Sequence, residues 1–187
     1  MRKIAAHYWL RPDGSIGKFP IISFDAAGRI SEIRERDQFV EEPFLELTNG
    51  LLIPGLIDSF NPSIFVDNDA DLRKILNRYL IQGVKVLGLS KTLYELFNKI
   101  QNDQLLLHVT KKTLKDQSGS IGFKKIQDAD ESLSELVKMT TVNAEKLSIE
   151  NRFGKLNIGT SPGIISISNF DNISFNMHSQ SKIKIII

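Results

Sequence analysis

The chain has 187 residues, of which 41% are hydrophobic, enough to form one domain or two small ones around a buried core. Lys and Arg number 24 against 22 Asp and Glu. The basic residues are scattered, which argues against nucleic acid as a partner. The absence of Cys excludes disulfides and thiolate chemistry. No stretch has the roughly 20 apolar residues of a membrane span, and the N-terminus lacks the apolar core of a signal peptide. We therefore expect a cytoplasmic protein that does not contact membranes.

The first 50 residues carry alternating and short apolar runs separated by turn residues, a pattern typical of short strands. The predicted strands are residues 4–10, 19–24, 30–33, 44–47 and 51–53, with turns at 12–15, 25–29 and 49–50. Gly28 is available for the positive φ that the second of these turns needs. This region is predicted to form a small antiparallel sheet.

From Asp69 the apolar spacing changes from two to 3.6 residues, which indicates helices. A first amphipathic helix is expected up to Gly83, followed by a strand at residues 84–89, a second helix around Leu93 to Ile100, and a strand at 105–109. Strands that alternate with helices imply parallel pairing through crossover connections.

The rest of the chain returns from a helix to strands. Residues 111–125 are polar and are predicted to form a loop, after which Asp128 and Glu131 resemble a capping box that starts a helix ending near Leu147. Further strands are expected at residues 163–167, 173–175 and 183–187. The chain is thus β-rich at both ends and α/β in the middle, which favours pairing of the two ends into one small sheet domain.

Three segments, taken in order, resemble one family. They are residues 49–58 (NGLLIPGLID), 139–147 (MTTVNAEKL) and 153–164 (FGKLNIGTSPGI). They resemble, in turn, the Pro-Gly entry into the first barrel strand, the last helix, and the return into the terminal sheet of the amidohydrolase superfamily. They look most like those of bacterial aminohydrolases of the adenosine-deaminase-like and aminodeoxyfutalosine-deaminase-like kind.

The resemblance implies a (β/α)₈ barrel with a small β-sandwich built from both termini. A complete barrel takes about 250 residues, whereas residues 53–152 offer room for only a few βα units. We therefore predict an α/β protein in two parts. Residues 1–52 and 153–187 would form a composite β-sandwich, and residues 53–152 would form a truncated, incomplete TIM-barrel-like part.

In the family that the chain resembles, the acidic residue after Pro-Gly is followed by a His-x-His pair that ligates a metal ion. Asp58 occupies the acidic position here, and Phe60 and Pro62 occupy the two ligand positions, where neither can bind a metal. The chain has three histidines. His7 and His178 are expected in the first and last terminal strands, and His108 is expected to be a packed residue at a barrel strand. We therefore predict no metal site and no cofactor.

The remaining candidates have ordinary structural interpretations. Asp58 is a weak candidate for a general base, but without a metal or partner a turn role is favoured. An acidic cluster could hold a cation, although capping of the following helix is favoured. Neither the glycine-flanked segment 119–122 nor its serines has a lysine or base that would give it chemistry. Sheet packing is favoured for two aromatic residues near the N-terminus. The acidic cluster consists of Asp67, Asp69 and Asp71, the serines are Ser118 and Ser120, and the two aromatic residues are Tyr8 and Trp9.

These observations favour a catalytically inactive amidohydrolase-like protein, a pseudoenzyme with a binding, regulatory or scaffold role. The alternative is a hydrolase acting on carbon–nitrogen bonds other than peptide bonds, with a rebuilt or partner-completed site. A third hypothesis is a small-molecule binding module. A pocket that joins Asp58 to another titratable group would favour the enzyme, and a closed apolar pocket would favour the inactive remnant. An incomplete parallel sheet leaves edges uncovered, so we expect a homodimer, with a full-length amidohydrolase as a further candidate partner.

Overall fold

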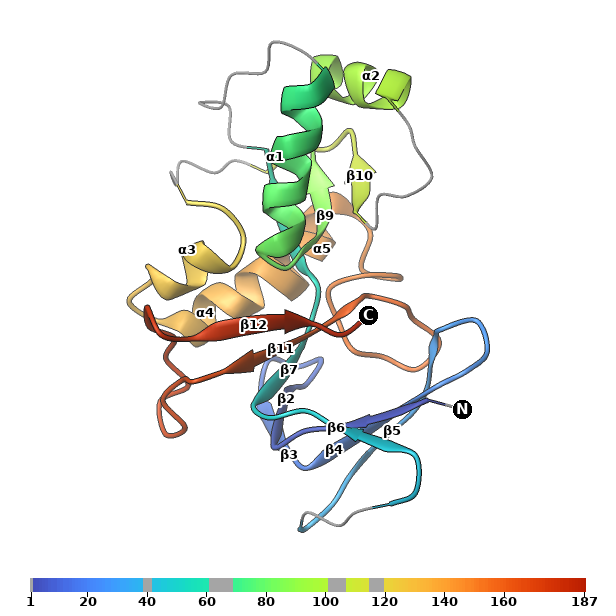
Figure 1. The fold of residues 1–187 in the computed structure, drawn as a ribbon, viewed down its shortest axis with the longest axis vertical. Coiled ribbons are helices and arrows are strands. Elements are labelled where there is room, and N and C mark those ends of the chain that lie inside the picture. Colours follow the sequence, from blue (N-terminus) through green and yellow to red (C-terminus); the bar gives the residue numbers. More distant parts are fainter. Residues whose placement is uncertain (1, 39–41, 61–68, 101–106, 115–119) are drawn as a thin grey trace.

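The computed structural model describes residues 2–38, 42–60, 69–100, 107–114 and 120–187, and it is a mixed α/β structure. In Figure 1 the helices lie in the upper part of the molecule and most of the strands in the lower part. The strands are β1 (Lys3–Ala5), β2 (Tyr8–Leu10), β3 (Ile16–Lys18), β4 (Pro20–Phe24), β5 (Ile30–Glu35), β6 (Leu45–Leu47), β7 (Leu51–Pro54), β8 (Leu56–Ser59), β9 (Val84–Gly88), β10 (His108–Thr110), β11 (Ile164–Ser168) and β12 (Lys182–Ile185). The helices are α1 (Asp69–Ile81), α2 (Lys91–Ile100), α3 (Phe123–Gln127), α4 (Ser132–Val137), the π-helical turn η1 (Lys138–Val142) and α5 (Asn143–Leu147).

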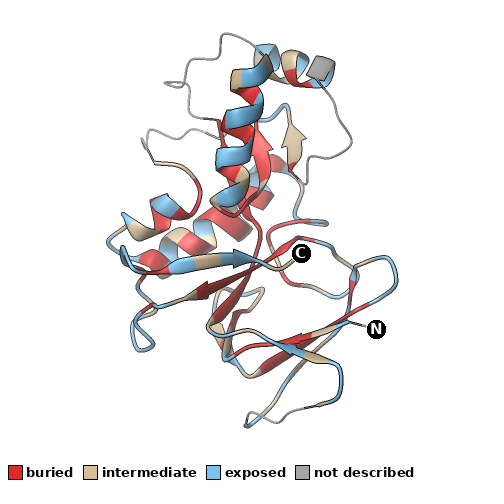
Figure 2. Cartoon of the chain, in the orientation of Figure 1, coloured by how far each residue is buried: buried red, intermediate tan, exposed pale blue. Residues whose placement is uncertain are grey.

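Strands from both ends of the chain share one sheet. Its order is β12-β11-β7-β2-β3, and a second sheet has the order β5-β4-β1-β6. A hydrophobic cluster joins the two, with Ile4 and Ile22 from one sheet and Trp9, Leu52 and Ile164 from the other. Burial of these apolar side chains stabilises the contact between the sheets. In Figure 2 the buried residues follow the strands that face this cluster.

The prediction of one antiparallel sheet in the first 50 residues is wrong in two respects. The strands divide between two sheets, and β1 pairs with β6, and β2 with β7, in parallel. The reason is that the chain crosses from the first sheet into the second twice, once from β1 to β2 and once from β6 to β7. Because the two crossings run in the same direction, their strands lie parallel. The hairpin at residues 25–29 is confirmed, with Gly28 at φ 74° between the antiparallel strands β4 and β5.

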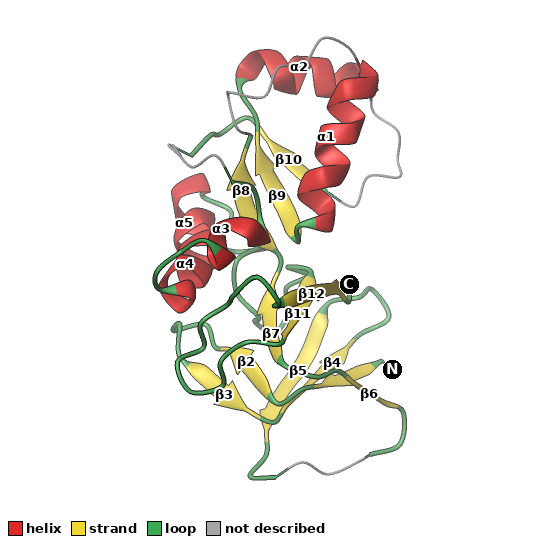
Figure 3. Ribbon diagram, turned by 60° about the vertical axis from the view of Figure 1, so that its left-hand side comes forward, coloured by secondary structure: helices red, strands yellow, loops and turns green. Residues whose placement is uncertain are grey.

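A parallel sheet of order β10-β9-β8 forms the α/β part, as the alternation of strands and helices predicts. One face of this sheet carries Leu56, Val84 and Leu87, which share a cluster with the apolar side of α1. The other face carries Ile57 and Val86 and is covered by Ala144, Leu147 and Phe153. Figure 3 shows this sheet between α1 and the helices that follow residue 122.

Three local predictions are corrected by the structure. The polar segment 111–125 is not wholly a loop, because α3 begins at Phe123. Asp128 does not cap the next helix, since it ends α3 and its carboxylate binds Lys124 and Ser120. Residues 173–175 form a turn instead of a strand. There the Asp171 carboxylate accepts the backbone N–H groups of the second and third residues after it, a local bond that competes with strand pairing.

Within the described ranges, no helix combines the length and apolar character that crossing a membrane requires.

Candidate functional site

The Asp58 carboxylate lies at the carboxyl end of β8 and is held by three donors. Its Oδ1 accepts hydrogen bonds from the backbone N–H of Ser59 (2.8 Å) and from Lys125 Nζ (2.6 Å), and its Oδ2 accepts one from the backbone N–H of Gly122 (2.9 Å). The side chains of Lys125 and Asp58 are 6% and 3% exposed. They therefore form a buried, hydrogen-bonded ion pair, which has the contacts that a buried charge requires.

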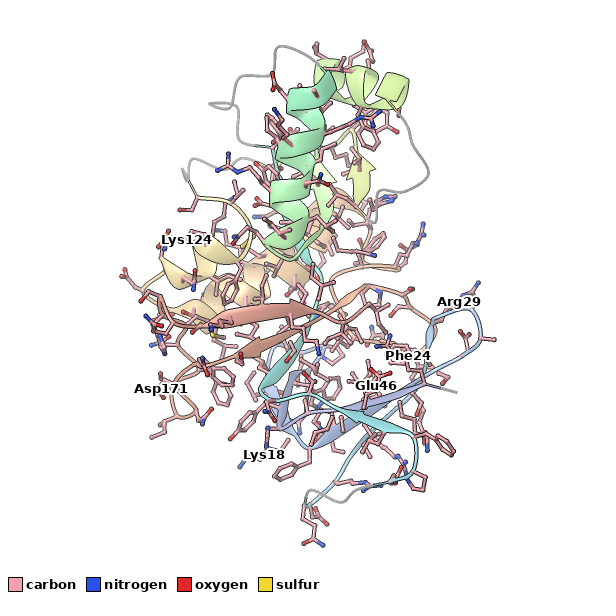
Figure 4. The ribbon with its side chains drawn as sticks, in the orientation of Figure 1. Lys18, Phe24, Arg29, Glu46, Lys124 and Asp171 are labelled. Atoms are coloured by element: carbon pink, nitrogen blue, oxygen red, sulfur yellow. The ribbon has the colours of Figure 1, made fainter. Side chains whose placement is uncertain are left out.

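The local sequence explains how Lys125 reaches Asp58. Gly122 has φ 51° and ψ −133°, and a Cβ there would lie 2.6 Å from the carbonyl oxygen of Gln82, so only glycine fits this bend. The bend directs its own N–H to the carboxylate and starts α3, which brings Lys125 inward. Its neighbour Lys124 lies on the outer side of α3 in Figure 4 and pairs with Asp128 at 2.7 Å.

Asn143 connects the carboxyl end of β8 to α5 through a hydrogen bond. Its side-chain nitrogen donates a hydrogen bond of 2.8 Å to the carbonyl oxygen of Ile57, and the residue is buried. This contact connects the segment 139–147, which resembles the family's last helix, to the strand that follows Pro-Gly.

A cavity of about 250 Å³ lies beside the ion pair. Its lining residues are Asp58, Thr113, Leu114, Lys125, Glu135, Lys138, Met139, Asn143 and Lys146. Lys138 Nζ is 2.9 Å from the Glu135 carboxylate, whereas Lys146 has no ion pair among the described residues. Two of the lining lysines thus have carboxylate partners in the protein, and the third is free to contact a bound molecule.

The residues at the expected metal position do not fit a metal ion. Phe60 is buried and stacks on Tyr79, with ring centroids 6.1 Å apart, so it contributes only an apolar ring. Pro62 lies outside the described residues. Among the residues that the structure does describe, no group of three His, Asp or Glu side chains lies close enough to hold a metal.

None of the three histidines lines the Asp58 cavity. His7 lies between β1 and β2, and His178 lies in the loop before β12, so the expectation that both belong to terminal strands is wrong. The chain bends at His7 as it passes from β1 to β2, and the His178 carbonyl oxygen accepts the Ser181 N–H in a local turn. His108 begins β10, is half-buried, and packs against Phe153 as expected.

The other sequence candidates have structural roles where they are described. Ser120 Oγ donates to the Asp128 carboxylate at 2.7 Å. Trp9 donates from Nε1 to Glu35 at 2.6 Å, and Tyr8 packs edge-on against Phe175. Asp67, Ser118 and the side chain of Asp69 lie outside the described residues; Asp71 lies in the first turn of α1, 3.9 Å from Lys74.

Sequence reasoning did not find Lys125, Glu135, Lys138 or Asn143 as site residues. Lys125 belonged to the predicted polar loop, and a lysine in such a segment gives no sign of burial. A usable signal was the pair of glycines at 119 and 122 ahead of Phe123, since a glycine before an apolar residue can mark a sharp bend into a helix.

No protein-family model matches this sequence, and none of the curated proteins matches it. Solved structures give partial matches. A putative prolidase from Bifidobacterium longum is 15% identical, with a TM-score of 0.42, and the match covers 78% of this chain and 38% of that one. The N-acetyl-D-glucosamine-6-phosphate deacetylase of Mycobacterium smegmatis is 12% identical, with a TM-score of 0.39, over 48% of this chain and 26% of that one. An amidohydrolase from Brucella melitensis is 17% identical, with a TM-score of 0.33, over 46% and 26%.

All three matches have identities of 17% or less and TM-scores below 0.5. The chain spans only about a quarter to two fifths of the length of these three structures, so their activities do not transfer to it.

Proposed function

We propose that the chain is a catalytically inactive, amidohydrolase-like protein that binds a small molecule in the cavity beside Asp58. The observation that carries the proposal is the state of the Asp58 carboxylate. An ionised carboxylate has about four acceptor positions, and three of these are filled by Ser59, Gly122 and Lys125. A general base needs an acceptor directed at the substrate proton, and the described donors leave only about one of the four positions for this.

The lining supports binding. Thr113, Asn143 and Lys146 bring hydroxyl, amide and ammonium groups to a cavity that also has apolar walls at Leu114 and Met139, and Lys146 has no ion pair among the described residues. Polar groups that converge on a cavity can fix the orientation of a bound small molecule.

A second candidate function is hydrolysis of carbon–nitrogen bonds other than peptide bonds, with a rebuilt or partner-completed site. One observation favours it, because Asp58 shares its cavity with Glu135 and with lysines, and such clusters of titratable groups are common in active sites. The ion pair of Glu135 with Lys138 weighs against Glu135 as a free base.

A single NMR experiment separates the two functions. The full chain is incubated with a set of small amides and their carboxylic acid products, and proton spectra report both line broadening from binding and new signals from turnover. We expect broadening without new products, and weaker broadening in Lys146→Met. Turnover that is lost in Asp58→Asn would contradict the proposal, and so would an absence of broadening for every compound. Lys74→Met, which removes an exposed charge on α1, is the matched control.

We also propose the finer architecture that the resemblance implies. Residues 1–52 and 153–187 would be the composite β-sandwich, and 53–152 the truncated TIM-barrel-like part. The sheet that joins β2, β3 and β7 to β11 and β12 supports the first part of this proposal. A homodimer would cover the open edges of the β10-β9-β8 sheet. Light scattering at micromolar concentration should then give twice the 21.1 kDa chain mass, and a monodisperse monomer would contradict it.

A further inference from the structure

Lys85 occupies an irregular position in the parallel sheet. Leu56 pairs with Val84 and Ile57 pairs with Val86, so Lys85 is an extra residue in β9 with no partner in β8. Such a β-bulge changes the direction of the side chains around it. Val84 packs on the face covered by α1, whereas Val86 packs on the face covered by Phe153. Lys85 therefore joins Val86 on the second face instead of alternating with it.

Two glycines make room for the stem of this lysine. A Cβ added to Gly55 would lie 2.4 Å from Lys85 Cβ, and one added to Gly163 would lie 3.1 Å from its Cδ. The two Pro-Gly pairs of the chain thus border the groove in which the Lys85 side chain lies half-buried. Its position is fixed by packing, which lowers the entropy that a binding group would otherwise lose.

Two further basic side chains meet at Phe153. The His108 ring stacks on the Phe153 ring, with centroids 5.0 Å apart and an angle of 29° between the rings. The guanidinium carbon of Arg152 lies 5.2 Å from the centre of the same phenyl ring. His108 pairs with Val86 in the parallel ladder, so it lies on the same face as Lys85.

None of these three side chains has a carboxylate partner among the described residues. Burial and the Arg152 charge lower the pKa of Lys85. Burial, together with the Arg152 and Lys85 charges, lowers the pKa of His108. Among the described residues, the charged neighbours that lower these two pKa values are all cations. Like charges held together repel, and partial burial makes the repulsion stronger than it would be in water.

We propose that Lys85, His108 and Arg152 form a binding site for a small oxyanion, the phosphate or carboxylate group of a metabolite. An anion would supply the missing negative charge, and the planar guanidinium of Arg152 can bind two oxygens of one phosphate or carboxylate. Lys85 would contribute a fixed point charge, and His108 a ring N–H. None of its three residues lines the Asp58 cavity, so the site does not depend on the function proposed for that cavity.

The test is an NMR titration of the full chain with inorganic phosphate, methyl phosphate and acetate at low salt. The chain has three histidines, so the imidazole signals of His108 can be assigned by comparison with His108→Gln. We expect a saturable shift of the His108 signals and a higher His108 pKa in the presence of the anion, with His7 and His178 unaffected. The three ligands distinguish free phosphate, a phosphate ester and a carboxylate.

Variants locate the site. Arg152 is exposed, so Arg152→Gln leaves the fold intact. It should weaken the best of the three anions about tenfold or more, since a hydrogen bond to a charged group is worth at least that factor. Lys85→Met keeps the apolar part of the side chain but removes its charge, and it should weaken anion binding by a similar factor. Lys74→Met, which removes an exposed charge on α1 away from both sites, should bind the anions as the wild type does. No saturable shift with any of the three anions, or equal affinity in wild type and Arg152→Gln, would overturn the proposal.

Discussion

The two faces of the β10-β9-β8 sheet differ in whether the protein supplies a carboxylate partner for the cations that lie there. At the end of β8, Asp58 pairs in the ladder with Leu87, and its carboxylate neutralises the buried Lys125 within the protein. On the face that carries Val86, burial and the Arg152 charge lower the pKa of Lys85 and of His108, and neither has a described carboxylate partner. An internal ion pair contributes to the stability of the fold, whereas a cationic cluster without a carboxylate partner binds an anion from solution. The difference predicts that variants at the first face change stability and that variants at the second change binding.

The largest expected effect is at the buried ion pair. Lys125→Met leaves the Asp58 carboxylate buried without its cation and should cost about 3–5 kcal/mol of unfolding free energy. Urea denaturation measures it. The double variant Asp58→Asn/Lys125→Met removes both charges and should recover much of the loss, which a double-mutant cycle quantifies.

Lys124→Met is the matched control for this pair, because the neighbouring lysine is 51% exposed in its ion pair with Asp128. Its effect should stay within about 0.5 kcal/mol. If Lys125→Met were as mild as Lys124→Met, the ion pair would not stabilise the fold, and the contrast between the two faces would disappear.

Gly122→Ala should have the next largest effect. Its backbone conformation strongly favours glycine and costs another residue about 1–3 kcal/mol, and the new Cβ would also meet the Gln82 carbonyl oxygen. Gly28→Ala is a suitable comparison, since Gly28 has φ 74° but open space around it. The thermal midpoint should fall further in Gly122→Ala, and equal shifts in the two variants would show that the bend beside Asp58 tolerates a side chain.

The smallest effect is the acid dependence that His108 contributes. Its pKa in the folded chain lies below the ordinary value of 6.5, so the unfolded chain binds a proton more readily. The stability that this residue contributes is complete above pH 6.5 and is lost as the pH falls through the lowered value. Between pH 8 and pH 5, the wild type should therefore lose more unfolding free energy than His108→Gln.

His7→Gln serves as the control for the acid dependence, because His7 is exposed and lies between β1 and β2. Its unfolding free energy is measured over the same pH range and compared with that of His108→Gln. If His108→Gln lost as much unfolding free energy as the wild type over this pH range, the acid dependence would not arise from His108 in the cationic cluster.

Local patterns predicted the elements better than they predicted the contacts between them. The apolar spacing of Leu72, Leu76 and Tyr79 defines α1, and Gly83 follows its end. The parallel pairing of β2 with β7 was not predicted, because no local pattern records which distant strand a segment meets. The same limit applies to the candidate site. Asp58 was recognised from its place after Pro-Gly, but its partner lies 67 residues away in what reads as a polar loop.

The bulge at Lys85 illustrates a second limit. A lysine between two valines reads as the solvent-facing position of an alternating strand. One extra residue in the ladder changes which face each side chain occupies, and no residue type in the segment marks that change. The His108 contact with Phe153 likewise depends on segments that meet only in the folded chain.

The central place of β7 in its sheet has a consequence for the order of folding. β7 pairs with β2 on one side and with β11 on the other, and Thr48 reaches Ser166, 118 residues later, through a hydrogen bond of 3.0 Å. During synthesis the ribosome must reach Ile164 before this second side can be covered. Until then the nascent chain presents the open edge of β7, and closure of such distant pairs is slow. The first 60 residues therefore depend on the last 25 to complete their sheet.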